Sequence, residues 1–297
     1  MVKGILLAGG SGTRLYPMTK AYNKQLIAVY DKPLIHYPLA TLMLSGIRQF
    51  LVITTPRDRS LIEGLLGDGS QWGLAISYAE QHAPKGIAEA LIIGRDFVGG
   101  DDFALILGDN IFFGHGLKNI LQEAGTGRPG ATVFGYWVPN PEDFGVVTFD
   151  HQGRVQSIEE KPLRRRSHYA VTGLYFYDAR ACAFASALEP STRGELEITD
   201  VNRRYLELGE LHVHRLERGF AWLDAGTPDA LLDAANYIAT MERRQGLKIG
   251  CLEEIAWRAG WIDDGDLESL AAPIAQADYG RYLLGLLSER NGSSDGR

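Results

Sequence analysis

Hydrophobic and polar positions alternate along the first 110 residues in two different periods. Short runs rich in Ile, Leu, Val and Phe predict buried strands at residues 3–8, 50–55, 74–79 and 103–107. Helical spacing between these runs predicts helices at residues 34–45, 58–66 and 87–94. Asp58 is the expected N-cap of the second helix, which should end at Gly67. Strands that alternate with helices favour a parallel sheet covered by helices on both faces.

The pattern changes after about residue 130. Strand-like runs with few helices between them, which predict antiparallel additions to the sheet, lie at residues 131–138, 145–149, 155–159 and 170–177. Helical spacing returns at residues 179–188, 198–208 and 228–244, the last begun by Thr227 as N-cap and Pro228 in the first turn. Residues 252–287 predict two or three short helices.

These patterns predict a large α/β domain over residues 1–240 and a small helical segment over 241–290. Within the domain, the strand–helix alternation extends to about residue 130, and the strand-rich pattern and the helices after it occupy 131–226. The last residues, 291–297, are expected to be a flexible tail.

Composition narrows the functional classes. Hydrophobic residues make up 45% of the 297 residues and charged residues 23%, which argues against a wholly disordered chain. The formal net charge of −7 makes the chain a poor candidate for binding nucleic acid. Two cysteines, Cys182 and Cys251, provide neither a disulfide framework nor a Cys-rich zinc site. No apolar run reaches the roughly 18 residues of a membrane span, so we expect a cytoplasmic protein with no membrane or nucleic-acid partner.

A glycine-rich loop directly follows the first predicted strand. It differs from a dinucleotide fingerprint, because Leu15 stands where the third Gly is required, and from a P-loop, because Thr13 and Arg14 follow Gly12. Its backbone N–H groups can approach a triphosphate, and Arg14 and Lys24 can neutralise phosphate charge. A plain strand-to-helix turn is the alternative. The expected nucleotide contacts here are Leu7, Gly9, Gly10, Ser11, Gly12 and Thr13.

The ordered motifs of this chain resemble those of the sugar-1-phosphate nucleotidyltransferases, most closely the bacterial glucose-1-phosphate thymidylyltransferases. The resemblance covers the chain to about residue 288, and its motifs lie at residues 9–15, 29–35, 107–110, 158–162, 171–175, 193–200 and 222–224. It implies an α/β fold, a Rossmann-like mixed sheet flanked by helices and related to the GT-A glycosyltransferases. Antiparallel sugar-binding additions and a small C-terminal helical appendage complete the implied fold.

The resemblance implies transfer of a nucleotidyl group from dTTP to α-D-glucose 1-phosphate, which gives dTDP-glucose and pyrophosphate. This is the first step of dTDP-deoxysugar synthesis. The attacking phosphate is already a nucleophile, so no Ser, Cys or His is needed and no covalent enzyme intermediate is expected. Catalysis by positioning and charge neutralisation calls for cations, backbone donors and a hard divalent metal such as Mg²⁺.

Residue roles follow from the same resemblance. It makes Arg14, Lys24 and Lys161 catalytic and places Mg²⁺ on Asp109 and Asp224, although an isolated Asp at a strand end is more often a cap or turn residue. Nucleotide contacts are extended to Gln25, Gln81, Gly86 and Asp109, and the Gln81 amide can both donate to and accept from a pyrimidine imide. The implied contacts of the sugar phosphate are Gly145, Glu160, Lys161, Val171, Tyr175 and Arg193.

Relatives of this length form homotetramers and bind a nucleotide-sugar end product between subunits. The resemblance therefore implies a homotetramer with dTDP-rhamnose as a possible feedback inhibitor. The positions that match this second pocket are Gly114, His115, Arg218 and Glu254.

Four positions depart from the family pattern: Ala28, His36, Glu89 and Ala225. Glu89 lies near the base loop, so the choice between dTTP and UTP stays open, as does the identity of the hexose or amino-sugar phosphate. A metal-dependent glycosyltransferase usually carries Asp-x-Asp, whereas Gly108-Asp109-Asn110 stands here. A non-catalytic nucleotide-binding subunit would be expected to lack some of the charged residues. A dehydrogenase is disfavoured by the failed fingerprint.

Overall fold

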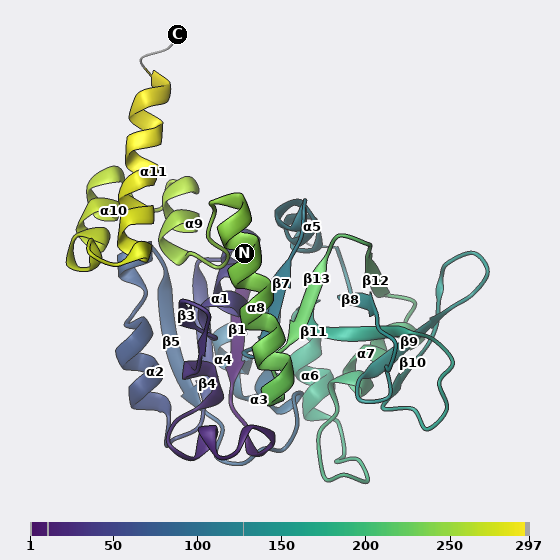
Figure 1. The fold of residues 1–297 in the computed structure, drawn as a ribbon. Helices are drawn as coiled ribbons and strands as arrows, with labels where there is room; N and C mark the ends of the chain where they lie inside the picture. Colours follow the sequence, from purple (N-terminus) through teal and green to yellow (C-terminus); the bar gives the residue numbers. More distant parts are fainter. Residues whose placement is uncertain (1, 11, 127, 295–297) are drawn as a thin grey trace.

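A mixed nine-stranded sheet forms the centre of the computed structural model, which describes residues 2–10, 12–126 and 128–294 (Figure 1). Seven strands follow the order β10-β9-β11-β6-β1-β4-β5, and β8 joins β11 and β12 beside them. The strands of this sheet are β1 (Lys3–Ala8), β4 (Gln49–Thr54), β5 (Ala75–Glu80), β6 (Phe103–Leu107), β8 (Ala131–Trp137), β9 (Gly145–Phe149), β10 (Val155–Glu160), β11 (Tyr169–Tyr177) and β12 (Leu211–Leu216).

The half of the sheet built from β6, β1, β4 and β5 is parallel. Along β1, Leu6 and Ala8 belong to one hydrophobic cluster, whereas Ile5 and Leu7 belong to another. Successive side chains of a strand point to opposite faces, so both faces of this strand are buried. The predicted parallel sheet with helices on both faces is confirmed.

The other half of the sheet carries the additions. Strand β11 is antiparallel to β6, β8 and β9, as expected. Strand β12, which the pattern did not predict, runs parallel to β8. A parallel neighbour needs a crossover connection, and the helix α7 (Ile198–Glu207) that precedes β12 belongs to that connection. The pattern analysis missed both β12 and the small sheets β2–β3 (Ala28–Val29, Lys32–Pro33) and β7–β13 (Asn110–Phe113, Ala221–Asp224).

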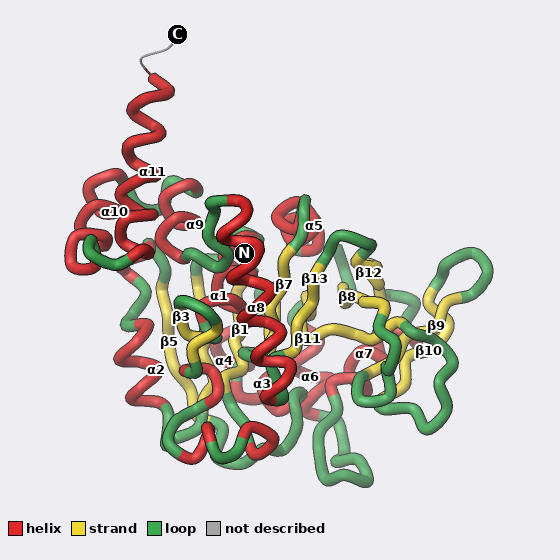
Figure 2. Tube along the Cα trace, viewed as in Figure 1, coloured by secondary structure: helices red, strands yellow, loops and turns green. Residues whose placement is uncertain are grey.

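Helices cover the sheet and continue beyond one end of it (Figure 2). The helices before residue 225, apart from α7, are α1 (His36–Leu44), α2 (Arg59–Leu66), α3 (Glu89–Ile93), α4 (Arg95–Val98), α5 (Leu117–Ala124) and α6 (Arg180–Ser186). Short 3₁₀ turns also occur, among them η1 (Thr13–Leu15) and η3 (Lys24–Leu26) near the glycine-rich loop. No helix among the described residues combines the length and apolarity that a membrane crossing requires.

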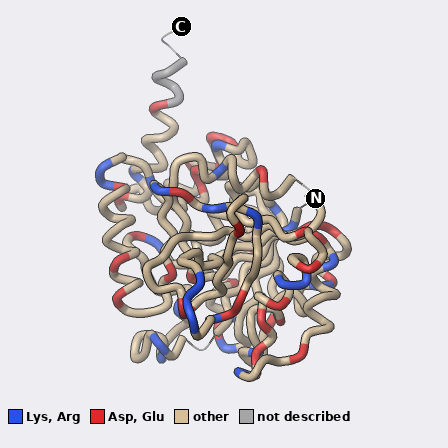
Figure 3. The backbone as a smooth tube through the Cα atoms, turned by 90° about the vertical axis from the view of Figure 1, so that its right-hand side faces the viewer, with Lys and Arg blue, Asp and Glu red and all other residues tan. Residues whose placement is uncertain are grey.

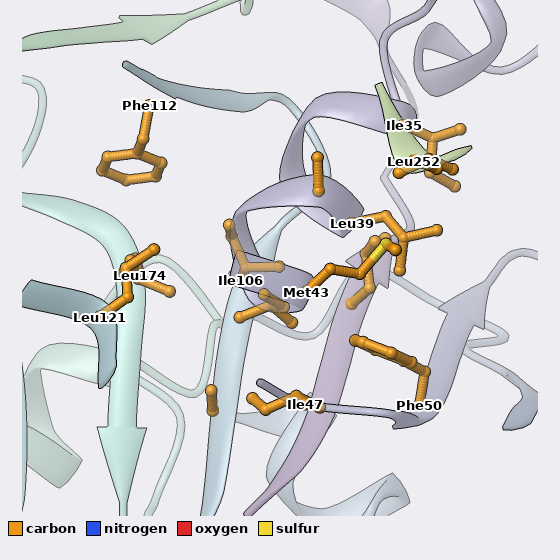
Figure 4. Close-up of a cluster of buried hydrophobic side chains, with 14 of the residues drawn as sticks. Ile35, Leu39, Met43, Ile47, Phe50, Ile106, Phe112, Leu121, Leu174 and Leu252 are labelled. Carbon is orange, nitrogen blue, oxygen red and sulfur yellow. The ribbon is translucent and has the colours of Figure 1, made fainter. Parts of the chain in front are cut away.

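The core between α1 and the sheet explains how the C-terminal helices are attached. Leu39 and Met43 of α1 face Phe50 and Ile106 of the strands below (Figure 4). Leu252 of α9 (Leu252–Arg258) lies in the same cluster and is fully buried. Burial of each such side chain contributes about 1.5–3 kcal/mol, so α9 is held to the sheet domain by the same hydrophobic effect as α1.

The C-terminal region is more helical than its pattern predicts. Helix α8 (Pro228–Gln245) starts as expected, because the Thr227 side chain accepts from the Ala230 N–H at 3.2 Å, and it passes residue 240 without a break. After α9 and α10 (Asp264–Ala271), helix α11 (Asp278–Ser294) is long rather than short. It continues into the expected flexible tail as far as Ser294, since extending a formed helix costs little. Residues 295–297 lie outside the described part.

Candidate active site

The carboxyl ends of β1 and β6 bring the two principal motifs to one edge of the sheet. The strands are parallel neighbours with Leu7 opposite Leu107, so the glycine-rich loop and the Gly108-Asp109 pair leave the sheet together. The Gly108 N–H donates to the Leu7 carbonyl at 2.9 Å, which extends this pairing. The carboxyl edge of parallel strands is the usual ligand site of α/β sheets.

The glycine-rich loop is shaped by backbone conformations that favour glycine. Gly10 and Gly12 have φ angles of 101° and 59°, and the Thr19 hydroxyl donates to the Gly12 carbonyl at 2.7 Å. Arg14 stands exposed on η1, which begins at Thr13. Ser11 lies outside the described residues. A cavity of about 370 Å³ opens beside the loop, and its lining includes Gly10, Gly12, Thr19, Lys24, Asp58 and His82.

Lys24 is held close to the glycine-rich loop by Asn23. The Asn23 amide donates to the Ala8 carbonyl at 3.2 Å and to the Asp58 carboxylate at 3.0 Å, and its oxygen accepts from the Gln25 N–H at 2.9 Å. The expected cap at Asp58 is therefore wrong in its chemistry. Asp58 precedes α2, but its carboxylate accepts from Asn23 and Thr55 instead of the helix N–H groups. Sequence reasoning missed Asn23, because Asn before a short turn is a common capping residue.

Asp109 and Asp224 come together through the β7–β13 pair. Asp224 lies opposite Asn110 in that antiparallel pair, and the Ala225 N–H donates to the Asp109 carbonyl at 3.0 Å. Asn110 also orients its neighbour, since its amide donates to the Asp109 carboxylate at 2.9 Å. The Asn110 oxygen in turn accepts from the Trp222 indole at 2.6 Å and from the Gly173 N–H at 3.0 Å. The adjacency of Asn110 to Asp109 was the only sequence signal for this role.

The two carboxylates have opposite pKa shifts. Burial alone would raise the pKa of Asp109, but the ion pair with Lys24 holds it below its usual value. Burial and the nearby Asp109 charge raise the pKa of Asp224 to about 6. Arg14 and Lys24 oppose this rise and Asp143 adds to it, so all five groups share one electrostatic neighbourhood. Asp143, in the loop before β9, was missed by the sequence analysis.

This pair of carboxylates fits a hard divalent cation. No cluster of three or more His, Cys, Asp or Glu side chains suited to a metal occurs among the described residues, so the protein would supply two carboxylates here. Mg²⁺ keeps several waters and takes its other ligands from phosphates, so two carboxylates are a typical protein contribution. Asp109 and Asp224 repel each other, and this repulsion contributes to the raised pKa of Asp224. A cation bound between the two carboxylates would reduce the repulsion.

The residues expected to contact a base lie on the other side of the loop. Gln81 directly follows β5 and is buried, and a Cβ built on Gly9 would meet its Oε1 at 2.5 Å. Gln25 is also buried, and its Oε1 has no hydrogen-bond partner. Gly86 has a φ of 106°, and a Cβ there would lie 2.3 Å from the Leu196 carbonyl. The absence of a side chain at Gly86 therefore allows Leu196 to pack against it.

Four predicted sugar-site residues, Gly145, Glu160, Val171 and Tyr175, lie close together in the second half of the sheet. Thr199, missed by the sequence analysis, donates to the Glu160 carboxylate at 2.6 Å. A Cβ on Gly145 would lie 3.0 Å from the Thr199 hydroxyl, 3.5 Å from Glu160 and 3.8 Å from Val171. Tyr175 is buried, and burial together with the charges of Glu160 and Asp109 raises the pKa of its hydroxyl. Tyr175 therefore lies within electrostatic reach of both Glu160 and Asp109.

Lys161 and Arg193 reach the same region by different means. Lys161 follows β10 with a positive φ of 42°, which is a strained conformation for a residue other than Gly, and its N–H donates to the Phe144 carbonyl at 3.0 Å. The Arg193 guanidinium donates to Glu197 at 2.7 Å and to Glu160 at 3.2 Å. In this state, its charge is engaged by carboxylates at the place where a sugar phosphate is expected.

The residues expected in a second pocket are spread over two regions. Gly114 lies against Phe220, whose ring would meet a Cβ at 2.3 Å, and Arg218 bridges to Phe220. His115 is exposed beside Gly114. Glu254 lies on α9, where it accepts from Arg258 at 2.7 Å and from the Tyr282 hydroxyl at 2.5 Å.

Comparison with known families settles the class of protein. The nucleotidyl transferase family model matches residues 3–241, which include both carboxylates and the glycine-rich loop. The chain belongs to the nucleotidyl transferase family. Other family members share much of its sequence. A protein named glucose-1-phosphate thymidylyltransferase from Xanthomonas campestris pv. campestris (strain B100) is 60% identical over 284 residues, which is 96% of each chain.

Further relatives agree in sequence and in fold. A glucose-1-phosphate thymidylyltransferase from Neisseria meningitidis is 58% identical over 97% of this chain and 100% of its own. A solved structure of a UDP-glucose pyrophosphorylase in complex with UDP-glucose matches with a TM-score of 0.71 and 25% identity, over 81% of this chain and 100% of that one. The expected fold class, a mixed α/β sheet flanked by helices, is confirmed by this match.

Proposed function

We propose that this nucleotidyltransferase is a glucose-1-phosphate thymidylyltransferase, which converts dTTP and α-D-glucose 1-phosphate into dTDP-glucose and pyrophosphate. A phosphate oxygen of the sugar attacks the α-phosphorus in line. The bond from the α-phosphorus to the oxygen bridging to the β-phosphorus breaks, and pyrophosphate leaves with that electron pair. No group of the protein is covalently modified. The product is the entry compound for dTDP-deoxysugar synthesis.

The observation that carries this proposal is the group formed by Lys24, Asp109 and Asp224 beside the glycine-rich loop, combined with relatives of the stated name at up to 60% identity. Lys24 exchanges its anionic partner, Asp109, for a phosphate oxygen of the nucleotide. Arg14 stabilises charge on the leaving pyrophosphate. Asp109 and Asp224 would hold Mg²⁺, which supplies charge neutralisation and Lewis-acid polarisation at the α-phosphate.

The remaining site residues orient the two substrates. Loop atoms from Leu7 to Thr13, with Gln25, Gln81 and Gly86, bind the nucleotide. Glu160 binds sugar hydroxyls while Thr199 fixes its carboxylate, and Gly145, Val171 and Tyr175 shape the pocket wall. Lys161 and Arg193 bind the sugar phosphate, for which Arg193 leaves Glu160. In this proposal, residues 1–130 serve the nucleotide and residues 131–226 the sugar.

Pyrophosphate release tests the proposal directly. The purified chain would be given Mg²⁺ with either dTTP or UTP, crossed with glucose 1-phosphate and several other sugar 1-phosphates. The expected result is highest kcat/KM for dTTP with glucose 1-phosphate. Turnover only with UTP or an amino-sugar phosphate would keep the chemistry and change the substrate. No pyrophosphate from any pair would overturn the proposal.

Assembly and regulation form a second part of the proposal. We infer a cytoplasmic homotetramer whose 241–290 segment contributes to assembly, and a feedback site for dTDP-rhamnose that includes Gly114, His115, Arg218 and Glu254. The contact of Gly114 with Phe220 supports a common site for the first three. Inhibition by dTDP-rhamnose should weaken in Arg218→Ala, and unchanged inhibition in that variant would contradict the site. Sedimentation of the chain would measure the oligomer.

A further inference from the structure

Buried Gln81 and half-buried Glu89 form a hydrogen-bonded pair beside the glycine-rich loop. The backbone N–H of Gln81 donates to the Thr54 carbonyl at 2.8 Å, so Gln81 continues β5 alongside β4. Its side-chain Nε2 donates to Glu89 Oε2 at 2.8 Å, and the Gly86 carbonyl lies 3.5 Å from the same nitrogen. Gln81 is only 6% exposed, which restricts where its amide can turn. Glu89 stands at the first position of α3.

The chemistry of Glu89 decides which way this amide faces. An ionised carboxylate only accepts hydrogen bonds, so the amide nitrogen of Gln81 must face Glu89. The carbonyl oxygen must then face the opposite side, where it lies against Gly9. A neutral amide at position 89 could both donate and accept, and it would tolerate either orientation of Gln81. Glu89 therefore fixes the orientation of the Gln81 amide, which a glutamine at position 89 would leave free to adopt either orientation.

In the proposed nucleotide site, the acceptor side of Gln81, which lies against Gly9, faces the base. His82, directly after Gln81, lines the same cavity of about 370 Å³ as Gly10 and Lys24. An acceptor here matches a base that carries an N–H in its ring, as thymine and uracil do at N3. Cytosine presents a lone pair at that position, which would face the Gln81 oxygen and leave a buried acceptor without a donor.

We propose that Glu89 sets the base selectivity of the site by locking the Gln81 amide with its oxygen toward the base. The assignment rests on the proposed nucleotidyl transfer and adds to it a determinant of substrate choice. Glu89 is a positioning residue, because it acts through Gln81 and does not touch the nucleotide. It selects imide bases against cytosine, and it does not distinguish thymine from uracil, which have the same imide edge.

The test compares Glu89→Gln with the wild-type chain. The values of kcat/KM for dTTP, UTP and dCTP would be measured with glucose 1-phosphate and Mg²⁺, and dissociation constants for dTTP and dCTP by calorimetry. We expect the dTTP-to-dCTP ratio to fall about tenfold in both measurements. The dTTP-to-UTP ratio should not change. A matched control is Glu80→Gln, because Glu80 lies one residue before Gln81 but pairs with Arg59 at 3.2 Å.

A double-variant cycle separates positioning from a structural role. In a Gln81→Ala background, Glu89→Gln should have no further effect on the dTTP-to-dCTP ratio, because its route to the base has been removed. An unchanged ratio in Glu89→Gln, or an equal loss for all three nucleotides, would overturn the inference. Glu89→Ala, which removes the acceptor and so releases the Gln81 amide, provides a second variant if Glu89→Gln folds poorly.

The two proposals fail in different ways. A wild-type chain that binds dTTP in preference to dCTP but releases no pyrophosphate would overturn the transferase proposal, and the selectivity measured by binding would still decide the role of Glu89. A chain that turns over dTTP but keeps its full selectivity in Glu89→Gln would overturn only the inference about Glu89. A wild-type chain that binds both nucleotides equally would overturn the inference as well.

Discussion

Lys24 forms an ion pair with Asp109, which joins η3 to the segment directly after β6. The side chains are 18% and 15% exposed, so the pair is shielded from water on most sides. A carboxylate held this way stays ionised, because the pKa of Asp109 is lowered by the Lys24 ammonium against the effect of burial. In the proposed function, this pair keeps Asp109 deprotonated for a metal ion and holds Lys24 in position for a phosphate before either substrate binds.

Replacing Lys24 tests the catalytic half of this arrangement. Lys24→Met should lower kcat/KM for dTTP by about 10²–10³-fold, because a preorganised charge at the transition state is lost. The melting temperature should also fall, because the buried Asp109 carboxylate loses its cation, so the kinetics are measured well below the melting transition. Lys118→Met, which removes an exposed lysine of α5, is the matched control for charge. The role would be contradicted by full activity in Lys24→Met, or by an equal loss in both variants.

The Asp224 carboxylate should lower the stability of the metal-free protein and should be necessary for activity. Its folded-state pKa of about 6 lies above the unfolded value of 3.8, so its favourable contribution exists at low pH and is lost as pH rises through 6. Asp224→Asn should therefore raise the melting temperature at pH 7.5 in EDTA by about 4 °C, with no gain at pH 4. It should also lower kcat about 10²-fold or more.

Thermal melts without and with Mg²⁺ measure the destabilisation by the Asp224 carboxylate and the stabilisation by metal binding. Wild-type protein should be stabilised by Mg²⁺, and Asp224→Asn should lose most of that stabilisation. Asp233→Asn, on the exposed face of α8, removes a carboxylate without touching the site and serves as the control. An equal melting temperature for wild type and Asp224→Asn at pH 7.5 would show that the two carboxylates do not repel.

Much of this fold was predictable from sequence, because its buried strands are continuous apolar runs. The boundaries of β1 and β6 are those expected, since the runs Lys3–Ala8 and Phe103–Leu107 each end directly before a glycine. Strand β12 was not predictable, because half-buried histidines at 212 and 214 disguise its pattern. Its parallel pairing with β8 depends on a crossover that no local signal reports.

The candidate site was predictable where a single motif carries the chemistry. Asp109 ends an apolar strand, whereas Asp224 is brought to it only by the β7–β13 register. Thr199 and Asn23 could not be found, because a buried hydroxyl or amide is recognised as functional only when its partner is known. The packing of Gly86 against Leu196 could not be found either, because the two residues are far apart in the sequence.

The hydrogen bond from Thr199 to Glu160 should affect the sugar phosphate and not the nucleotide. Thr199→Val keeps the shape of the side chain and removes the donor, so the Glu160 carboxylate is free to turn toward Arg193. We expect KM for glucose 1-phosphate to rise about tenfold, while KM for dTTP stays within about twofold. Thr148→Val is the control, because it removes a hydroxyl contact to Ser157 on β9 and β10. Equal changes in both KM values would contradict the assignment.

His36 makes the stability of the protein depend on pH outside the active site. It begins α1, and both ring nitrogens are buried without a hydrogen-bond partner. Burial lowers the pKa of His36 from 6.5 to about 4, against the charges of Glu253 and Asp31, and Lys32 adds to the effect. The ring therefore stays neutral in the folded chain at pH values where it is protonated in the unfolded chain.

The sign of this effect follows from proton binding. Between pH 6.5 and 4 the unfolded state binds one more proton than the folded state at His36, so stability is present above pH 6.5 and falls as the pH drops toward 4, by about 3 kcal/mol in all. His36→Leu should remove this loss, so its urea midpoint should exceed that of wild type by more at pH 5 than at pH 7.5. His82→Leu, with a side chain 78% exposed, should change neither value. If His36→Leu shows the same difference in urea midpoint from wild type at both pH values, the imidazole is not held neutral by burial.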